Sequence, residues 1–464
     1  MIISLWMVPF LLTYLSKPEY GLFAIAGDLL GWLSISSLGI TSALNSKGAQ
    51  LLGNENRKEL NVVINTTLFT QLATSILIIL VGGLILLNPR EFFGNVTDIE
   101  NFEIVVAILI TSYYLQYINQ PFSSLLVADK QIHIDNYLKL GLLLIQTALT
   151  VIFLTQGYKL LALAYSNFIA NLIIISITWY RVKRSFPDLT FSIEFWRKDR
   201  MIYLLKNGLW FTVGGVAGIL IYRMDAFLIG KYLSLTLVTA FIINSKMYQI
   251  AEKIHSQFFN TSRPYFAQMY GKGDIDKFSK LYNIVYYTSF YAAFIIGLSV
   301  YLISEWFIGL WVGNEYYLGR EINLLLCVNF IIQAGVLPNR IILATSLFKN
   351  REHALTRIFD GILKLSLSVV FIKEFGVSSI IIAAIISSLI FSNLSLNYLS
   401  GKLLGEGYFQ KLLPIIPALL ILIALLFQKI NEQFIVFSLI AICFTLIYIN
   451  LMRKHSSYLK YNGV

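Results

Sequence analysis

The stretch YLSKPEYGLFAI (14–25) recurs in part as YLSLTLVTAFII (232–243), with Tyr, Leu, Ser and Phe at matching places. The same offset, which pairs position 14 with position 232, also pairs AQLLG (49–53) with AQMYG (267–271). Two matches in one register, with no gap between them, indicate an internal repeat. We therefore predict that the chain contains two copies of one structural unit.

The composition is that of a membrane protein. Of the 464 residues, 57% are hydrophobic and 13% are charged, and the mean hydropathy is +0.70. Soluble domains average about 25% charged residues. Uncharged runs of helix length recur, such as LATSILIILVGGLILL (72–87) and FIVFSLIAICFTLIYI (434–449). We predict an all-α polytopic membrane protein, and a very apolar soluble enzyme is the weaker alternative.

Apolar segments of roughly 20 residues predict about fourteen transmembrane helices. The predicted spans are 1–16, 21–45, 61–87, 103–127, 138–156, 160–181, 203–227, 235–258, 281–303, 322–345, 356–373, 378–399, 412–428 and 433–451. The repeat makes the first six and the next six helices two pseudo-symmetric lobes in parallel orientation, a common transporter plan. The predicted domains are an N-lobe (1–181), a basic cytoplasmic linker (182–202), a C-lobe (203–400) and two extra C-terminal helices with a cytoplasmic tail (401–464).

The Lys and Arg residues set the orientation. With the N-terminus in the cytoplasm, the cytoplasmic segments hold 24 of the 36 Lys and Arg residues and the opposite face holds seven. This ratio follows the positive-inside rule and places the C-terminus in the cytoplasm. It also accounts for the net charge of +11 without a nucleic-acid partner.

The sequence carries no signature of catalysis or of a metal site. Cys327 and Cys443 lie in apolar runs, and the four histidines lack ligand spacing. No Walker A or HExxH motif occurs, and we expect no cofactor and no catalytic residue. A membrane glycosyltransferase or polymerase is a further alternative, but the longest predicted loop has only about 20 residues.

The first predicted span is short. Met1 aligns through the repeat with Ile219, which lies deep inside the predicted helix 203–227. We expect that the native N-terminus lies upstream of Met1. The alternative is a short, tilted or re-entrant first segment.

The segment LLTYLSKPEYGLFAIAGDLLGWLSISSLGITSALNSKGAQLLGN (11–54) resembles the opening of the polysaccharide-biosynthesis flippases. These are the Wzx-type O-antigen flippases of the multidrug/oligosaccharidyl-lipid/polysaccharide (MOP) superfamily, which is MATE-like in fold. RMDAFLIGKYLSLTLVTAFIINSKMYQ (223–249) resembles the family again. Ser37 stands where the family often has an acid, so that carboxylate's role does not carry over.

The resemblance implies a flippase that moves an undecaprenyl-pyrophosphate-linked oligosaccharide, an O-antigen or capsule repeat unit, by alternating access. It implies a place in the bacterial cytoplasmic (inner) membrane, contact with membrane lipids, and the polymerase and chain-length proteins of the same pathway as partners. The alternative is a MATE-type cation-coupled multidrug antiporter, whose cavity should be lined by acids and aromatic rings.

Charges at membrane depth are the candidate site residues, because each costs roughly 2.5–3.5 kcal/mol on insertion scales. Lys246, Gln249, Lys253 and Gln257 follow one another at helical spacing and form one polar stripe. We interpret Lys246 and Lys253 as a cationic cavity wall that binds pyrophosphate. The alternative is that a buried acid neutralises Lys246.

Asp28 is the repeat equivalent of Lys246, and we expect the two to meet near the central axis. Asp28 is then a coupling residue that responds to H⁺ or Na⁺, or else half of a static ion pair. Arg223 and Asp225, two apart in the span 203–227, are interpreted as a substrate-binding and a gating residue, or as residues at the outer interface.

Arg340 follows Pro338 in the span 322–345. Because proline kinks a helix, we expect a gate there, with Arg340 in the cationic cavity. The alternative is an arginine at the cytoplasmic end of the span that binds lipid headgroups.

Overall fold

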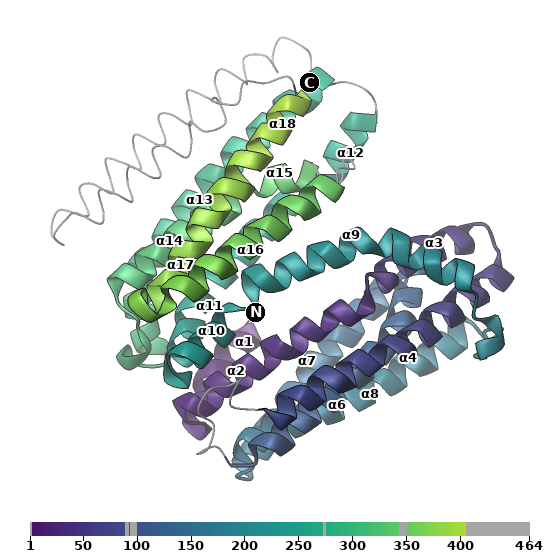
Figure 1. Cartoon of the computed structure of the whole chain (residues 1–464), viewed down its shortest axis with the longest axis horizontal. Helices are drawn as coiled ribbons and strands as arrows, with labels where there is room; N and C mark the ends of the chain where they lie inside the picture. The colour runs from purple at the N-terminus through teal and green to yellow at the C-terminus, as the bar shows by residue number, and fades with distance from the viewer. Residues whose placement is uncertain (1, 89–91, 93–99, 272–274, 343–349, 405–464) are drawn as a thin grey trace. The chain divides into compact units, whose positions relative to one another are not determined.

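The computed structural model describes residues 2–88, 92, 100–271, 275–342 and 350–404 (Figure 1). The regular structure of these residues is entirely helical. The chain divides into two compact units, Met1–Thr239 and Ala240–Val464, each of which is considered by itself.

The first unit contains α1 (Ile2–Tyr14), α2 (Lys17–Trp32), the 3₁₀ turn η1 (Leu33–Ser37), α3 (Ile40–Gly53), α4 (Arg57–Leu87), α6 (Phe102–Ala128), α7 (Ile132–Thr155), α8 (Lys159–Ser185), η2 (Ile193–Phe195), α9 (Lys198–Tyr222) and α10 (Asp225–Tyr232). Helix α11 (Leu235–Asn260) crosses the boundary. The second unit continues with α12 (Arg263–Gly271), α13 (Ile275–Trp311), η3 (Asn314–Tyr316), α14 (Arg320–Gly335), α15 (Leu337–Ile341), α16 (Asn350–Phe375), α17 (Val377–Ser387), the π-helical η5 (Ser388–Ser395) and α18 (Leu396–Leu404).

The prediction of an all-α polytopic membrane protein is confirmed. Eight helical stretches of the described residues are long and apolar enough to cross a membrane. The remaining spans predicted before residue 400 coincide with α1, with α2 and α3 together, with α11 and with α16. The spans predicted at 412–428 and 433–451 lie outside the described residues.

The helix starts confirm the repeat. The offset that pairs Lys17, the start of α2, with Leu235, the start of α11, recurs at four further pairs of helix starts. These pairs are α4 and α13, α6 and α14, α7 and α16, and α8 and α17. These helix starts keep one offset throughout.

The repeated YLS triplets are helix-to-helix turns. In the first copy Tyr14 ends α1, and Ser16 precedes α2; the backbone N–H of Ser16 donates to Glu19 Oε2 at 2.8 Å, which is half of a capping box. In the second copy Tyr232 ends α10, and Ser234 Oγ accepts from the backbone N–H of Leu237 at 3.2 Å, at the start of α11. The triplet recurs because a serine at the N-cap satisfies amides that no helical carbonyl reaches.

The predicted helix 21–45 is broken, which corrects the sequence interpretation. Between α2 and α3 the chain passes through η1, and then Leu38 and Gly39 adopt left-handed backbone conformations. Gly39 packs directly on Gly208 of α9, and a Cβ added at either glycine would overlap the backbone of the other. The LGI segment is therefore a helix break that accepts a crossing helix, and only glycine fits at position 39.

The basic linker is tied to α4 over residues 186–197. Asn65 of α4 is fully buried, and its Nδ2 donates to the carbonyl of Thr190 at 2.8 Å while its Oδ1 accepts from the N–H of Ser192 at 3.0 Å. Arg200, in the first turn of α9, pairs with Glu59. The predicted lobe boundary at 182–202 remains a prediction, and the structure places α9 in the first compact unit with α3 and α4.

Each unit is a bundle of packed helices. In the first unit α6 packs between α4 and α8, and α7 packs on α8 (Figure 1). In the second unit α13 packs on α14, and α17 packs on both α14 and α16. Buried aromatic rings of α12 and α13, such as Phe266, Phe278 and Tyr282, form a core cluster there with residues of α15 and α18.

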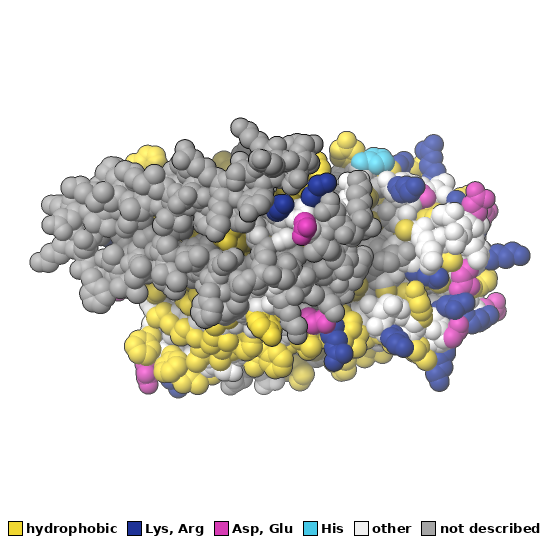
Figure 2. All heavy atoms as spheres, turned by 90° about the horizontal axis from the view of Figure 1, so that it is seen from above, with side chains coloured by type: hydrophobic (Ala, Val, Ile, Leu, Met, Phe, Trp, Pro, Cys, Tyr) yellow, Lys and Arg dark blue, Asp and Glu magenta, His cyan; other side chains and the backbone are white. Residues whose placement is uncertain are grey.

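Charged and hydrophobic side chains are segregated on the surface. On the face shown in Figure 2, hydrophobic side chains form a continuous area, and charged side chains gather at the end where α3 ends and α4 begins. Exposed apolar residues on α4, such as Ile79 and Leu80, would be unfavourable in contact with water. They suit contact with lipid.

Candidate functional site

The first unit brings Asp28 and Arg223 together. Arg223 Nη1 lies 3.6 Å from Asp28 Oδ1, and the side chains are 45% and 30% exposed respectively. Arg223 caps the C-terminus of α9, while Asp28 lies in the last part of α2. A pair this open contributes at most about 1 kcal/mol, so the contact can be made and broken at low cost.

Gly31 lets the arginine approach α2. A Cβ added at Gly31 would overlap the guanidinium of Arg223, whereas a Cβ at Gly27, one turn earlier, would meet nothing within 4 Å. The absence of a side chain at Gly31 therefore positions Arg223 against the helix and beside Asp28.

Aromatic side chains lie near this pair. Trp32 meets the ring of Phe227 edge-on at 5.1 Å, and Tyr113 lies within range of the charge on Arg223. Among the described residues, Trp32 Nε1 and the hydroxyl of Tyr113 are buried with no hydrogen-bond partner. Buried polar atoms are nearly always satisfied, so these two suit hydrogen bonds to a ligand or to water.

Asp225 does not share a helix with Arg223. Helix α9 ends at Tyr222, Asp225 begins α10, and the predicted continuous span 203–227 is therefore wrong at its end. The charge of Asp225 acts on Asp28. Arg223 thus lies at the junction of α9 and α10, next to Asp28 and Asp225. A change in the angle between these two helices would alter the ion pair of Arg223 with Asp28.

In the second unit, the predicted polar stripe lies along one side of α11. Lys246 is half-buried, and Gln249, Lys253 and Gln257 are exposed. Lys246 and Lys253 are close enough for their charges to interact. Among the described residues, Lys246 forms no ion pair and no hydrogen bond.

The opposite side of α11 is anchored by buried polar groups. Asn244 Nδ2 donates to the carbonyl of Tyr316 at 2.7 Å, and the hydroxyl of Tyr248 donates to Asn323 Oδ1 at 2.7 Å. His255 Nε2 lies 2.9 Å from the carbonyl of Ser289. These contacts fix the rotation of α11 about its axis. The side that carries Lys246 and Lys253 therefore faces away from the packed helices of the second unit.

Arg340 lies in a different environment. The helix breaks at Val336, between α14 and α15, as the proline at 338 predicts. Arg340 Nη2 donates to Gln333 Oε1 at 2.7 Å, and Gln333 in turn contacts Ser388 of η5. The structure groups Arg340 with residues of α15, α16 and η5 of the second unit.

The predicted site residues therefore fall into three groups, which are Asp28 with Arg223 and Asp225, Lys246 with Lys253, and Arg340. Asp28 and Lys246 belong to different units, so their expected approach remains a prediction, and the partner that Asp28 has in the structure is Arg223. Gly31 and Asn244 escaped the sequence reasoning. The i,i+4 spacing of Asn244 and Tyr248, on the side of α11 away from the stripe, was the signal for the anchors.

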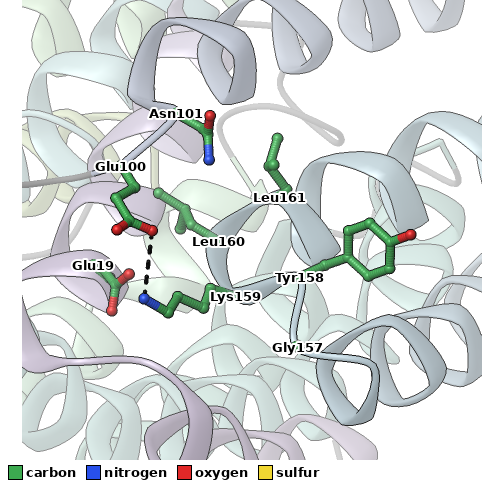
Figure 3. Close-up of a pocket in the computed structure, with 8 residues that line it drawn as sticks. All are labelled: Glu19, Glu100, Asn101, Gly157, Tyr158, Lys159, Leu160 and Leu161. Atoms are coloured by element: carbon green, nitrogen blue, oxygen red, sulfur yellow. Dashed lines mark hydrogen bonds and ion pairs between the residues drawn. The ribbon is translucent and has the colours of Figure 1, made fainter.

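A small cavity lies at one end of the first unit. It has a volume of about 190 Å³ and is lined by Glu19, residues 100–101 and residues 157–161. Figure 3 shows Lys159 between the carboxylates of Glu19 and Glu100, and its Nζ lies 3.5 Å from Glu100 Oε2. All three charges are engaged locally, since Glu19 caps α2 and Lys159 pairs with Glu100.

Comparison with known proteins identifies the chain. Residues 11–318 match the family model described as polysaccharide biosynthesis protein. The chain belongs to this polysaccharide biosynthesis family. No curated protein matches it.

Several solved membrane transporters share the fold of this polysaccharide biosynthesis protein. The lipid II flippase MurJ in an inward closed conformation has a TM-score of 0.68 at 14% identity, covering 97% of both chains. An inward-facing multidrug resistance MATE family transporter of the MOP superfamily also has a TM-score of 0.68, at 11% identity, covering 85% of this chain and 92% of that chain. A MOP superfamily transporter from Pyrococcus furiosus, described as having a binding pocket of reverse polarity, has a TM-score of 0.55 at 12% identity, covering 87% of this chain and 96% of that chain. This family member therefore has the MOP fold.

Proposed function

We propose that the protein is a flippase that moves a lipid-linked oligosaccharide, carried on a polyprenyl diphosphate, across the bacterial inner membrane. Membership of the polysaccharide biosynthesis family and the MOP fold support a transporter of glycan precursors. The observation that carries the proposal is the cationic side of α11, which faces away from the packed helices of the second unit. On this side Lys246 has no acidic partner among the described residues. A diphosphate supplies the counter-charge that this side lacks.

The aromatic surroundings of Arg223 suit the sugar portion. Carbohydrates bind through apolar contact with flat rings and through hydrogen bonds to buried polar atoms, and the group of Trp32, Tyr113 and Phe227 offers both. In this proposal the glycan contacts the polar interior while the polyprenyl tail stays in lipid.

The Asp28–Arg223 pair is the proposed coupling element. Protonation of Asp28, or binding of Na⁺ to it, would release Arg223 and change the contacts at the α9–α10 junction. Flipping would then depend on an imposed pH or Na⁺ gradient, and Asp28→Asn would remove that dependence while the fold is retained.

The test uses the full chain reconstituted in vesicles with a fluorescent polyprenyl-diphosphate oligosaccharide. An impermeant glycosidase added outside the vesicles cleaves the sugar that reaches the outer leaflet. The rate of cleavage therefore reports the rate of flipping. We expect flipping above the rate of protein-free vesicles, a loss of at least tenfold in Lys246→Gln, and no loss in Lys373→Gln, an exposed lysine at the far end of α16.

Mass spectrometry of lipid-linked sugars from host cells depleted of the protein supplies the cellular arm. Accumulation of the diphosphate-linked oligosaccharide on the cytoplasmic side supports the proposal. Normal lipid-linked sugars in these cells, together with unchanged flipping in vesicles, would overturn it. Uptake of cationic dyes would then test the MATE-type antiporter.

A further inference from the structure

The basic linker is a fixed part of the first unit. Besides the two bonds of Asn65, three further side chains on the same part of α4 hold it. Thr66 Oγ1 accepts from the backbone N–H of Arg197 at 3.1 Å, and Thr70 Oγ1 accepts from Trp196 Nε1 at 3.3 Å. Asn61 Nδ2 donates to Thr190 Oγ1 at 3.0 Å. These α4 side chains are all buried, so the linker side chains that face away from α4 keep a defined position.

Three aromatic rings from separate segments meet beside the linker. Phe191 of the linker meets Phe122 of α6 edge-on, with 5.7 Å between ring centroids, and Trp179 of α8 at 6.3 Å. Phe191 and Trp179 are both exposed. Because the backbone of Ser192 is extended, Ile193 lies on the same side of the chain as Phe191, and it is 68% exposed. The linker therefore presents apolar groups at its outer side, next to the end of α8.

Two aromatic–basic pairs continue this surface along the last turns of α8, where the predicted span 160–181 ends. Lys183 follows Trp179 by four residues and Arg184 follows Tyr180 by four residues, so each cation lies about one turn beyond a ring on the same side of the helix. Four residues advance a helix by about 6 Å. The headgroup region of one leaflet is about 5–7 Å thick. This spacing suits a ring at the edge of the hydrocarbon and a cation at the level of the lipid phosphates.

Positive charge is in excess on this surface. Residues 179–200 contain six Lys and Arg residues and three Asp and Glu residues. Of these, Asp199 pairs with Arg200. Lys183 and Arg184 are exposed, and neither has an ion-pair partner among the described residues. An anionic headgroup would complement these two cations, whereas a zwitterionic headgroup brings no net charge to them.

We propose that the end of α8 and the linker bind the headgroups of anionic phospholipids. We call this surface the aromatic–basic patch, and its members are Trp179, Tyr180, Lys183, Arg184, Phe191 and Ile193. The apolar groups lie at the boundary of headgroup and hydrocarbon, and the two cations bind the phosphates. Lipid is the neighbour that the structure favours, because the patch continues the apolar surface of the membrane-spanning α8. The inference goes beyond the proposed flipping and does not depend on it.

Binding at the linker also has a structural consequence. Since α4 holds the linker through buried hydrogen bonds, a lipid bound to the patch fixes α4 and α8 together at the membrane surface. The linker then acts as an anchor for this end of the first unit.

The experiment uses the full chain in phosphatidylcholine vesicles that contain no glycan carrier. A small fraction of phosphatidylglycerol with a photoreactive group near its headgroup is the probe, and phosphatidylcholine with the same group is the reference. Mass spectrometry of chymotryptic peptides measures the labelling of residues 179–200. Chymotrypsin is suitable because none of the substitutions below removes an aromatic residue.

The test variant combines Lys183→Gln with Arg184→Gln. The matched control combines Lys58→Gln with Lys206→Gln, which removes the same charge from exposed positions on α4 and α9. Exchange of the two cations, Lys183→Arg with Arg184→Lys, keeps the charge. Ile193→Ser changes the apolar side of the patch at an exposed position.

We expect phosphatidylglycerol to label residues 179–200 at least tenfold more than phosphatidylcholine in the wild type. The preference should be lost in the test variant and retained in the control and in the exchanged variant, and Ile193→Ser should reduce labelling by both lipids. Equal labelling by the two lipids in the wild type would show a segment that only borders the bilayer and would overturn the proposal. A test variant that keeps the preference at a wild-type unfolding temperature would overturn it as well.

Discussion

Asp28 and Lys246 occupy the same position in two copies of one helix. Each is the twelfth residue of its helix, because α2 begins at Lys17 and its repeat equivalent α11 begins at Leu235. The first copy places an acid there, next to Arg223, and the second copy places a cation with no ion-pair partner among the described residues. The two copies of this helix therefore carry opposite charges at the same position.

Gly31→Ala should reduce flipping at least tenfold. The added methyl group would overlap the guanidinium of Arg223 and move it away from Asp28. The vesicle assay measures the rate, and the unfolding temperature shows whether the fold survives. Gly27→Ala is the matched control, since its methyl group meets nothing within 4 Å, and alanine favours the helix by up to about 1 kcal/mol. Equal rates in the two variants would contradict the positioning role of Gly31.

Gly39→Ala should destabilise the first unit by at least about 1–2 kcal/mol. Alanine is strained at a φ of +65°, and its methyl group would also overlap the backbone of Gly208. Thermal unfolding in detergent provides the measurement. Gly214→Ala, on the same helix as Gly208 but with open space around it, should leave the unfolding temperature unchanged or raise it. A tolerated Gly39→Ala would mean that the two helices do not pack this closely.

Ser234→Ala should cost about 1 kcal/mol of stability through loss of the N-cap of α11. Ser16→Ala should cost a similar amount, since it removes the corresponding cap of α2. Ser234→Asp keeps an acceptor at the cap and should remain near wild type. Hydrogen exchange of the first turn of α11 would show the loss directly. Unchanged protection in Ser234→Ala would remove the capping explanation for the repeated YLS triplet.

His353 should make the protein less stable as the pH falls. Its folded-state pKa of about 4 lies below the ordinary value of about 6.5, so the unfolded chain binds a proton first. The free energy of unfolding begins to fall as the pH drops through about 6.5. It is lower by about 2 kcal/mol at pH 5, and this contribution is fully lost below about pH 4. His353→Asn should remove this part of the pH dependence, measured by unfolding at several pH values. An identical pH profile in wild type and His353→Asn would contradict the burial of the neutral ring.

The sequence by itself determined the class of the protein, most of its helices and the repeat. Hydropathy and helix length are local properties, so the apolar runs predicted the spans without knowledge of the packing. The repeat was visible because Tyr, Ser and Gly recur at helix ends, where backbone geometry restricts the choice of residue. The polar stripe of Lys246, Gln249, Lys253 and Gln257 was predictable for the same reason, since its spacing follows from one helix.

Only the tertiary structure decided which charges meet. Asp28 lies beside Arg223, which follows a helix far away in the chain. The expected approach of Asp28 to Lys246 remains a prediction. The helix break at Leu38 and Gly39 also depends on a partner, because the left-handed glycine accepts Gly208 of α9. Pairing of charges and close backbone contact depend on distances between segments, and local sequence pattern does not encode those distances.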